Sequence, residues 1–524
     1  MLTPNDLQQI CRHGLTSEIV DRQLRNFSKG FPFLRLKKAA GIRDGIICLE
    51  QQDIEKMCLF YDQSIKEGLI PLKFVPASGA ATRMFQVLYN FRQDYKDEGQ
   101  ALELLQEPRY AQVKLFFNSL HCFAFYEDLA LALAKDGKAI ENATKSEIID
   151  YLLTEKGLNY GNKPKGLLKF HRYGLLSKTP IEEHLEEACS YACPADGIIR
   201  IHLTVSPQHK VDFEAKIESV RQAFELKYDV KLDINFSEQK SSTDTVAVNT
   251  DNSFFRNTDG SLLFRPAGHG ALIENLNELD ADLIFIKNID NVTIDSLRGE
   301  TIRYKKALAG LLLQIRERIY HYQQILDIRN LFQIDDVLIT EVVEFLKNTL
   351  HIIPSLNFNS IEKEELIPYL KTKLDRPLRV CGMVKNEGDP GGGPFWTYNP
   401  DGTISLQIAE SSQIDMNDPQ QALIAKNASH FNPVDLVCSI KDYRGKKYDL
   451  TQYVNPETGF ISQKSQSGKV IKVQELPGLW NGAMAEWNTI FVEVPGITFT
   501  PVKTVFDLLK DEHLTNKKTI ELIQ

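Results

Sequence analysis

Short apolar runs and stretches of helical spacing alternate along the chain. Residues 72–75 are mostly apolar, which predicts a buried strand, and residues 198–206 alternate between apolar and polar as a strand does. Residues 207–226 have helical spacing, and residues 232–236 and 282–287 predict two further strands. Strands separated by helices in this way are typical of a parallel sheet with crossover connections. We therefore expect an α/β fold with a mixed, mostly parallel central sheet flanked by helices.

Two long segments show helical spacing without strands between them. In residues 85–160, apolar residues recur at intervals of three or four, as Val113, Phe116 and Leu120 do. This spacing predicts an inserted helical lobe. Residues 299–350 show the same spacing, and residues 350–376 look like a second insertion. Strand patterns then return at residues 379–384, 395–398 and 404–408.

The composition is that of an ordinary soluble globular protein, with 43% hydrophobic and 25% charged residues among 524. The formal net charge of -9 argues against nucleic acid or an anionic membrane surface as the main partner. The N-terminus lacks the basic start and apolar core of a signal peptide, and no apolar run approaches the ~20 residues of a membrane helix. We expect a cytoplasmic protein that binds neither nucleic acid nor membranes.

The stretch FVPASGAATRM, at residues 74–84, places small side chains directly after the first predicted strand. Small residues let a ligand approach the backbone, and successive amides ahead of a helix favour an anion. The guanidinium of Arg83 adds a fork of donors suited to phosphate. The pattern predicts a phosphate-binding loop; the alternative is a turn that only packs a strand against a helix. The candidate contacts are Ala77, Ser78, Gly79, Ala80, Thr82 and Arg83.

Two later segments offer charged groups at places where ligands bind. In KPKGLLKFH, at residues 163–171, a turn is expected to present Lys165, although a plain surface lysine is the alternative. The strand over residues 282–287 carries Asp290 to its carboxyl end, where ligands bind in open α/β sheets. A carboxylate there is a good ligand for Mg²⁺, which prefers oxygen and shares its shell with phosphates. Alternatively, Asp290 caps the segment that follows.

Taken together, these segments resemble the nucleotide-sugar pyrophosphorylases, which are nucleotidyltransferases of glycosyltransferase-A fold, and among them the UDP-sugar pyrophosphorylases. Residues 74–84 resemble their Gly-rich turn ending in Gly-Thr-Arg, with Ala81 in place of a second glycine. The segment around Lys165 is similar to their Pro-Lys-Pro-Leu-Leu. Residues 265–291 resemble their Pro-x-Gly-His-Gly turn, short helix, and strand ending Asn-x-Asp-Asn, and FTPVK at residues 499–503 resembles their Phe-x-Pro-Val-Lys.

The resemblance implies an enzyme that joins a nucleoside triphosphate such as UTP to a sugar-1-phosphate, with Mg²⁺ as cofactor, and releases pyrophosphate. It implies that Arg83 holds the leaving phosphates, that Lys165 and Lys503 hold the α-phosphate and the sugar phosphate, and that Asp290 binds Mg²⁺. The base would be read by Gly79, Gln239, Gly268 and His269. The sugar would be bound by Glu410, Asn432 and Asn481, where Glu410-Ser411-Ser412 is similar to the family's Glu-Tyr-Ser with Ser411 in place of Tyr.

The resemblance also implies three regions along the chain. We expect an N-terminal helical extension over residues 1–70 and a nucleotide-binding core over residues 71–350 with a helical insertion at 85–160. Residues 351–524 would form a C-terminal sheet on the sugar side that completes the cleft. The loop EGDPGGGP, at residues 387–394, either covers a substrate or joins two strands.

Two other functions are compatible with the same fold. A nucleotide or nucleotide-sugar binding protein without catalytic activity would explain Ala81 and Ser411, which depart from the family pattern. A glycosyltransferase would need an Asp-x-Asp metal pair at a strand end. The chain has Asp280-Ala281-Asp282, but this motif comes before its strand. The sequence identifies neither the sugar nor the base.

Overall fold

The computed structural model describes residues 2–79, 81–328, 333–355, 358, 361–388, 391–466 and 468–515. Ala80 of the predicted phosphate loop and residues 389–390 of the loop at 387–394 lie outside these ranges. The chain forms two compact units, each built from three separate segments. Unit 1 comprises Met1–Leu72, Ser237–Ile286 and Lys305–Pro495, and unit 2 comprises Lys73–Phe236, Lys287–Tyr304 and Gly496–Gln524. No described helix is both long enough and apolar enough to span a membrane.

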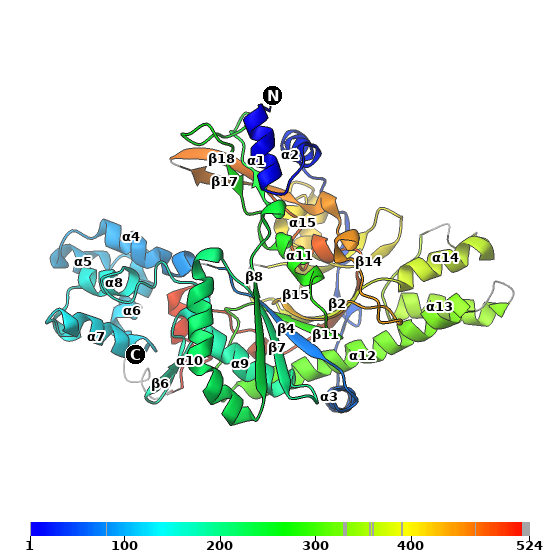
Figure 1. Cartoon of the computed structure of the whole chain (residues 1–524), viewed down its shortest axis with the longest axis horizontal. Helices are drawn as coiled ribbons and strands as arrows, with labels where there is room; N and C mark the ends of the chain where they lie inside the picture. The colour runs from blue at the N-terminus through cyan, green and yellow to red at the C-terminus, as the bar shows by residue number, and fades with distance from the viewer. Residues whose placement is uncertain are drawn as a thin grey trace. The chain divides into compact units, whose positions relative to one another are not determined.

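The fold is a mixed α/β fold with a central, mostly parallel sheet flanked by helices, as expected from the sequence (Figure 1). In unit 1, the strands of this sheet follow the order β2-β3-β19-β12-β16-β11, with β15 beside β12. The pairs β2/β3, β3/β19 and β19/β12 are parallel, whereas β16 and β15 run antiparallel to β12. The bounds are β2 (Gly41–Ile42), β3 (Gly45–Ile47), β11 (Leu283–Lys287), β12 (Leu378–Lys385), β15 (His430–Phe431), β16 (Asp435–Ser439) and β19 (Asn488–Glu493).

Unit 2 contains strands of the central sheet in the order β4-β7-β8, together with the helices α9 and α10. Apolar residues from these strands and helices form one core, which includes Val75, Ile201 and Phe213. The strands and helices predicted from residues 72–75, 198–206, 207–226 and 232–236 are all present. Their bounds are β4 (Pro71–Pro76), α9 (Pro180–Tyr191), β7 (Ile198–Thr204), α10 (Lys210–Tyr228) and β8 (Lys231–Ser237).

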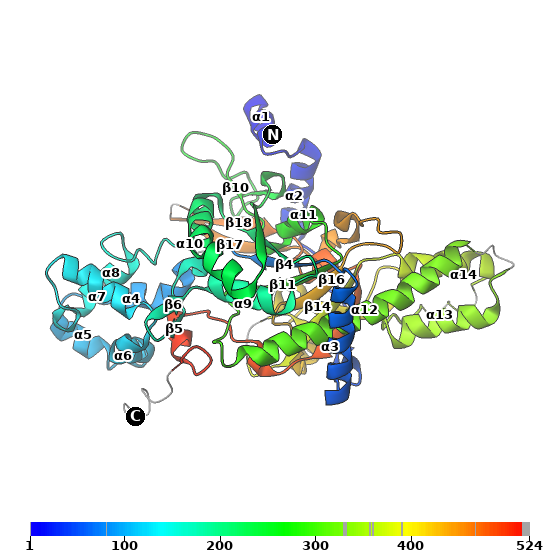
Figure 2. The same ribbon diagram turned by 60° about the horizontal axis from the view of Figure 1, so that its bottom comes forward.

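The predicted helical insertion is present in unit 2 as a group of short helices, visible in blue and cyan in Figures 1 and 2. A second apolar core holds these helices together and includes Phe91, Phe116 and Leu129. Val502 and Phe506 of the C-terminal segment belong to the same core. The helices are α4 (Gln86–Asp94), α5 (Glu98–Leu104), α6 (Ala111–Asn118), α7 (Tyr126–Lys135) and α8 (Lys145–Leu153).

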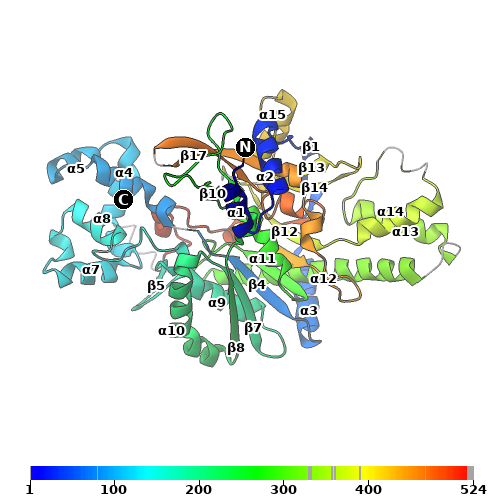
Figure 3. The same cartoon turned by 45° about the horizontal axis from the view of Figure 1, so that its top comes forward.

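Unit 1 contains two further groups of helices, one within residues 298–374 and one at the N-terminus. The segment at residues 299–350, predicted to be helical, forms α12 (Arg298–Ile328), of which the greater part lies in unit 1, and α13 (Asp336–Asn348), which packs beside α14 (Lys363–Leu374) (Figure 2). At the N-terminus, α2 (Ser17–Lys29) lies near the hairpin of β17 (Phe460–Gln466) and β18 (Lys469–Glu475) (Figure 3). The side-chain Nδ2 of Asn26 donates to the side-chain oxygen of Gln474.

The remaining helices and strands are distributed along the chain. They are α1 (Pro4–Arg12), α3 (Gln51–Lys66), α11 (Leu272–Asn277), α15 (Pro419–Lys426), β1 (Leu36–Ala39), β5 (His171–Tyr173), β6 (Leu176–Lys178), β9 (Thr245–Val246), β10 (Phe264–Arg265), β13 (Gly393–Tyr398) and β14 (Ile404–Ala409). β1, β13 and β14 form a separate antiparallel sheet.

Candidate functional site

Three predicted site residues from distant segments meet in unit 2. The Nζ atom of Lys165 lies 3.0 Å from Oδ2 of Asp290, and the Nζ atom of Lys503 lies 3.2 Å from the same oxygen. Lys165 and Lys503 lie 125 and 213 residues from Asp290 along the chain. Only the tertiary structure brings these side chains together.

Lys165 is fixed by tight packing and by its own hydrogen bonds. The next residue, Gly166, has no room for a side chain, because a Cβ atom there would lie 2.8 Å from the ring of Phe213 and 3.1 Å from Ile289. The Lys165 amide donates to the carbonyl oxygen of Gly79 at 3.3 Å, and its ammonium group donates to that of Val502 at 2.8 Å. The lysine is therefore tied both to the small-residue loop and to the C-terminal segment.

Backbone hydrogen bonds hold the segment around Asp290 against two neighbours. The amide of Ile289 donates to the carbonyl oxygen of Pro76 at 3.3 Å, at the end of β4. The amide of Val502 donates to the carbonyl oxygen of Asp290 at 3.0 Å, and the Asn291 side chain accepts from the amide of Thr500 at 3.0 Å. The C-terminal segment thus has a fixed register beside Asp290, which places Lys503 next to the carboxylate.

The charges of this cluster are unequally exposed. The side chains of Lys165 and Asp290 are 12% and 11% exposed, whereas that of Lys503 is 57% exposed. Burial by itself would raise the pKa of Asp290, but the ammonium groups of Lys503 and Lys165 outweigh it and hold this pKa below its usual value. Two ammonium groups and one carboxylate leave an excess of positive charge, which favours an anionic ligand.

The small-residue loop lies beside this cluster. The amides of Ala77 and Ala81 donate to the carbonyl oxygens of Thr204 and Lys163, at 2.8 and 3.2 Å, so neither is available to a ligand. Within the described ranges, no acceptor contacts the amides of Ser78 and Gly79, and both residues are exposed. These two amides are suited to an anion.

The rest of the loop differs from a plain helix start. Residues Ala81–Phe85 form a 3₁₀-helix before α4 begins. Thr82 and Arg83 are exposed in this turn, and no ion pair involves Arg83 in the described part of the chain. Arg83 therefore follows the loop amides closely along the chain, but it makes no contact with Asp290 in the described residues.

The donor set around Asp290 suits Mg²⁺ only when phosphate is also present. The described residues contain no group of three or more His, Cys, Asp or Glu side chains that could hold a metal ion. Mg²⁺ in phosphate sites takes one or two carboxylates and completes its shell with water and phosphate oxygens. Asp290 fits that requirement as the single carboxylate, provided that phosphates neutralise the two nearby lysines.

A second group of predicted residues lies in unit 1. The imidazole of His269 stacks on the Trp480 side chain, with ring centroids 4.1 Å apart and an interplanar angle of 6°. His269 Nε2 lies 4.0 Å from Oε1 of Glu410, and the side-chain Nδ2 of Asn481 donates to the same oxygen at 3.0 Å. Because His269 Nδ1 accepts from the amide of Leu479 at 3.0 Å, its proton is on Nε2 when the ring is neutral.

Burial shifts the pKa values of the two titratable side chains in this second group, His269 and Glu410, in opposite directions. Burial lowers the pKa of His269 to about 4, against a smaller effect of Glu475. Burial also raises the pKa of Glu410, and Glu475 raises it further, while the hydrogen bond from Asn481 lowers it. Gly268 has φ +80°, and a Cβ atom there would lie 2.9 Å from Oε2 of Glu475, so the turn requires glycine. The group offers a flat aromatic surface with donors and acceptors.

Two other predicted residues of unit 1 bond to protein atoms nearby. The Asn432 side chain donates to the carbonyl oxygen of Gly382 at 3.2 Å and accepts from the amide of Val434 at 3.0 Å. The Gln239 side chain donates to Thr243 and Asp244 at 3.3 and 3.4 Å. Asn432 is buried and shapes its own turn, whereas Gln239 is half-buried.

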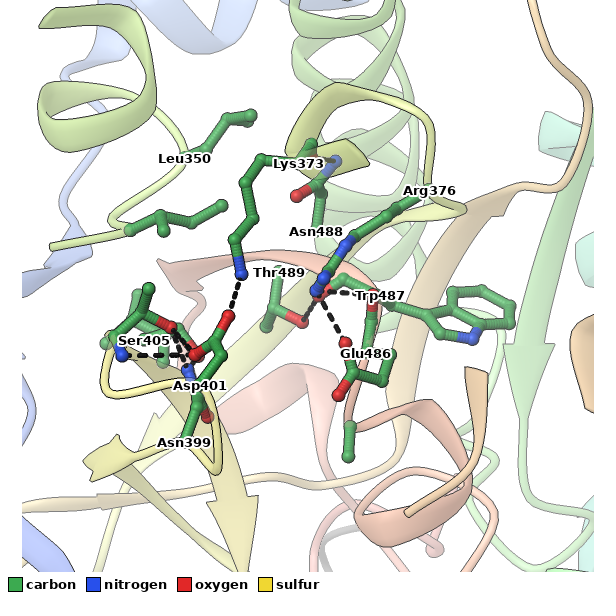
Figure 4. Close-up of a pocket in the computed structure, with 14 residues that line it drawn as sticks. Leu350, Lys373, Arg376, Asn399, Asp401, Ser405, Glu486, Trp487, Asn488 and Thr489 are labelled. Atoms are coloured by element: carbon green, nitrogen blue, oxygen red, sulfur yellow. Dashed lines mark hydrogen bonds and ion pairs between the residues drawn. The ribbon is translucent and has the colours of Figure 1, made fainter. Parts of the chain in front are cut away.

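A polar pocket elsewhere in unit 1 contains none of the predicted residues (Figure 4). Its walls include Lys373, which pairs with Asp401, and Arg376 Nη1, which lies 2.8 Å from Oε2 of Glu486. Its charged groups therefore neutralise one another.

Comparison with known protein families identifies the family to which the chain belongs. Residues 3–514 match the model of a family described as "Domain of unknown function (DUF4301)", and the chain belongs to that family. A search of curated protein sequences found no match.

The solved structures similar to this chain include UDP-sugar pyrophosphorylases. UDP-glucose pyrophosphorylase from Leishmania major, in complex with UDP-glucose, is 12% identical with a TM-score of 0.43, over 98% of this chain and 82% of that one. UDP-N-acetylglucosamine pyrophosphorylase from Trypanosoma brucei is 12% identical with a TM-score of 0.46, over 94% and 72%. A protein described as UDP-glucose phosphorylase from Trypanosoma brucei is 13% identical with a TM-score of 0.44, over 96% and 77%.

The structure adds residues that the sequence did not indicate. Trp480 and Glu475 belong to the unit 1 group, and only their closeness in sequence to Asn481 pointed to them. In unit 2, the carbonyl oxygen of Val502 binds Lys165, and Asn291 anchors Thr500. A backbone acceptor leaves no trace in residue type, so Val502 was not predictable.

Proposed function

We propose that the protein is a Mg²⁺-dependent nucleotidyltransferase that joins a nucleoside triphosphate such as UTP to a sugar-1-phosphate and releases pyrophosphate. The observation that carries the proposal is the contact of Lys165 and Lys503 with Asp290, beside the amides of Ser78 and Gly79, for which the described residues provide no acceptor. Two cations, one carboxylate and a small-residue loop are the groups that phosphoryl chemistry requires.

In this reaction an oxygen of the sugar phosphate attacks the α-phosphorus, and the bond to pyrophosphate breaks. The attacking oxygen is already ionised, so no general base is needed. The barrier comes from the crowding of negative charge and from alignment, which fixed cations and amides lower. When bound, Mg²⁺ would neutralise phosphate charge, and Asp290 is the residue that would hold it.

The two lysines are suited to different parts of this task. Lys165 is held by the Val502 carbonyl as well as by Asp290, so it supplies a fixed charge. The only side-chain partner of Lys503 in the described ranges is Asp290, and the more exposed ammonium can follow a phosphate as bonds form and break. We assign the α-phosphate to Lys165 and the sugar phosphate to Lys503. Arg83 is assigned to the leaving phosphates because it is exposed near the loop.

The unit 1 group provides chemistry suited to a base and a sugar. His269 with Trp480 offers a flat surface, and Gly268 lets a planar group approach the backbone. Glu410 and Asn481 together present an acceptor and a donor, which is the pattern that sugar hydroxyls require. We assign Gly268 and His269 to the base, and Glu410 and Asn481 to the sugar.

A thermal-shift screen tests this proposal first. Nucleoside triphosphates, sugar-1-phosphates and nucleotide sugars would each be added with and without Mg²⁺. A ligand present at about 100 times its Kd stabilises the native state by about 2.7 kcal/mol. We expect at least one triphosphate to raise Tm in the presence of Mg²⁺ and an Asp290→Asn variant to lose the Mg²⁺-dependent part. No shift with any triphosphate would contradict the proposal.

A non-catalytic nucleotide-binding protein remains the second candidate because of Ala81. This residue is fully buried and packs in the core of the helical lobe, so the position where the family pattern has a glycine is filled by a side chain. Ligand binding in the thermal-shift screen without any release of pyrophosphate would favour this candidate.

A further inference from the structure

The helix α9 of unit 2 is buried around its whole circumference although it is rich in charge. Nine successive residues, 180–188, are buried, and they include Glu182, Glu183, His184, Glu186 and Glu187. Burying ionised groups costs several kcal/mol each unless they are paired, and well-packed apolar residues often serve stability equally well. Stability alone therefore does not account for this helix.

Glu187 joins the two strands that lead to the candidate site. Its Oε2 lies 2.8 Å from Nζ of Lys73, and its Oε1 lies 2.6 Å from Nζ of Lys287. Lys73 lies on β4, which leads into the small-residue loop, and Lys287 ends β11, three residues before Asp290. All three side chains are at most 1% exposed. A single carboxylate thus fixes both approaches to the site.

His184 holds the backbone between Lys287 and Asp290. Its Nε2 lies 3.2 Å from the carbonyl oxygen of Asn288 and 3.3 Å from that of Ile289. Because carbonyl oxygens only accept, Nε2 carries a proton and donates to this pair. The imidazole is fully buried, and burial, followed by the charge of Lys73, holds its pKa well below the usual value. His184 is therefore a neutral, fixed donor to the residues that precede Asp290.

We propose that Glu187 and His184 are positioning residues that set the place of Asp290 relative to the small-residue loop. They contact neither Asp290 nor the amides of Ser78 and Gly79; they act through Lys73, Lys287 and the backbone at residues 288–289. The significance of this arrangement for catalysis rests on the proposed function, but the arrangement itself can be tested without any substrate.

The neighbouring glutamate provides a matched control. Glu186 is also buried on α9 and also pairs with two lysines, Lys178 at 3.0 Å and Lys227 at 2.9 Å, and its remaining partners are Arg298 at 4.0 Å and the hydroxyl of Tyr228. Neither lysine lies on β4 or β11. Glu187→Gln and Glu186→Gln therefore each remove one buried negative charge that pairs with two lysines. Only Glu187→Gln removes it from the group that contains Lys73 of β4 and Lys287 of β11.

Hydrogen exchange followed by mass spectrometry measures local opening of each peptide in the unliganded protein. In Glu187→Gln we expect the amides of residues 287–292 to exchange about tenfold faster than in the wild type, and in Glu186→Gln to stay within about twofold. Equal exchange of these residues in the two variants, whether fast or slow, would overturn the proposal.

A second pair of variants covers the case in which Glu187→Gln does not fold. His184→Gln keeps an N–H donor near the two carbonyl oxygens, whereas His184→Leu removes it. We expect faster exchange of residues 287–292 in His184→Leu and a return towards the wild-type rate in His184→Gln. The same exchange in both variants would contradict the role of His184.

Kinetics then separate this inference from the proposed function. If the wild type releases pyrophosphate, Glu187→Gln should lower kcat about tenfold or more while KM changes less than about threefold, since the substrate contacts remain. An active wild type with unchanged kcat in both Glu187→Gln and His184→Leu would overturn the positioning role. An inactive wild type would contradict the proposed function, while the exchange experiment would still decide the role of α9.

Discussion

The two lysines that contact Asp290 differ in what their removal costs. Lys165 is mostly buried and has a second partner in the Val502 carbonyl, whereas more than half of the Lys503 side chain is exposed. An ion pair with an exposed partner contributes little to stability. Lys503 therefore allows a test of function that is not confounded by unfolding.

For Lys503→Ala we expect a loss of at least about tenfold in the rate of pyrophosphate release, which corresponds to about 1.4 kcal/mol in the barrier. Charge that develops in the transition state would lack a partner. The free energy of unfolding should change by no more than about 0.5 kcal/mol. Lys503→Arg should restore little activity, because the planar guanidinium is bulkier than the ammonium. A rate within about twofold of the wild type would remove Lys503 from the site.

Asp290 makes the free energy of unfolding depend on pH in the acidic range. Its pKa is lowered in the native state from an ordinary value of 3.8, so the carboxylate contributes stability above that value. This contribution is lost as the pH falls from 3.8 through the lower native pKa. We expect Asp290→Asn to be less stable than the wild type near neutral pH and to lose less stability below about pH 4. Urea unfolding across that range measures both; parallel pH profiles would contradict the ion pairs described here.

Among single residues, the sequence predicted those whose chemistry is visible in residue type. Lys165, Lys503 and Asp290 stood in motifs with charged groups at strand or loop ends, and the fold brings them together. The partners that hold them in place, such as Gly79 and Val502, act through backbone carbonyls. These contacts depend on tertiary structure and not on side-chain type, which is why the sequence did not show them.

Among the elements, the C-terminal segment depends on a buried histidine contact. His513 Nδ1 lies 2.8 Å from Nε2 of His171, whose Nδ1 lies 2.8 Å from Glu183. The Glu183 carboxylate accepts from Nδ1 of His171, and one proton lies between the facing nitrogens of His171 and His513. The segment that carries Lys503 is thereby tied to α9.

This contact predicts a loss of stability at mildly acidic pH. Burial, followed by the charge of His171, lowers the pKa of His513 from 6.5 to about 3. Between these two values the unfolded chain binds a proton that the native state does not. The contribution of neutral His513 to the free energy of unfolding is therefore complete above pH 6.5 and decreases as the pH falls towards 3. Over this range one such group adds a slope of up to about 1.4 kcal/mol per pH unit. We expect His513→Asn to show a shallower pH dependence of unfolding free energy between about pH 6 and pH 5. An unchanged slope would contradict this assignment.

Element prediction succeeded where apolar runs were long. The strands β7, β11 and β12 follow their predicted ranges closely because several successive buried positions define each of them. It failed for short or irregular elements. Ala81–Phe85 form a 3₁₀-helix between the small-residue loop and α4, and β1, β2 and β3 have only two to four residues each.

At the scale of the whole molecule, the two units could not be read from the sequence. Three of the five boundaries fall inside β4, β11 and α12, and a fourth falls before the last residue of β8, so no change of composition marks these four. The α/β class and the helical insertion were predictable because they follow from periodicity over tens of residues. The assembly of unit 2 from three segments, with the C-terminal segment beside residues 290–294, depends on contacts between segments hundreds of residues apart.

The most direct test of the central claim is to follow the reaction by phosphorus NMR. Wild-type protein would be incubated with Mg²⁺, UTP and a panel of sugar-1-phosphates, alongside Lys165→Met. As a control, Lys169→Met alters a lysine of the same segment that pairs with Asp128 at 2.6 Å, away from the site. We expect the wild type and Lys169→Met to convert one pair of substrates into equal amounts of pyrophosphate and a diphosphate diester, and Lys165→Met to be at least about a hundredfold slower. Orthophosphate as the only product, or equal rates in the two lysine variants, would contradict nucleotidyl transfer at this site.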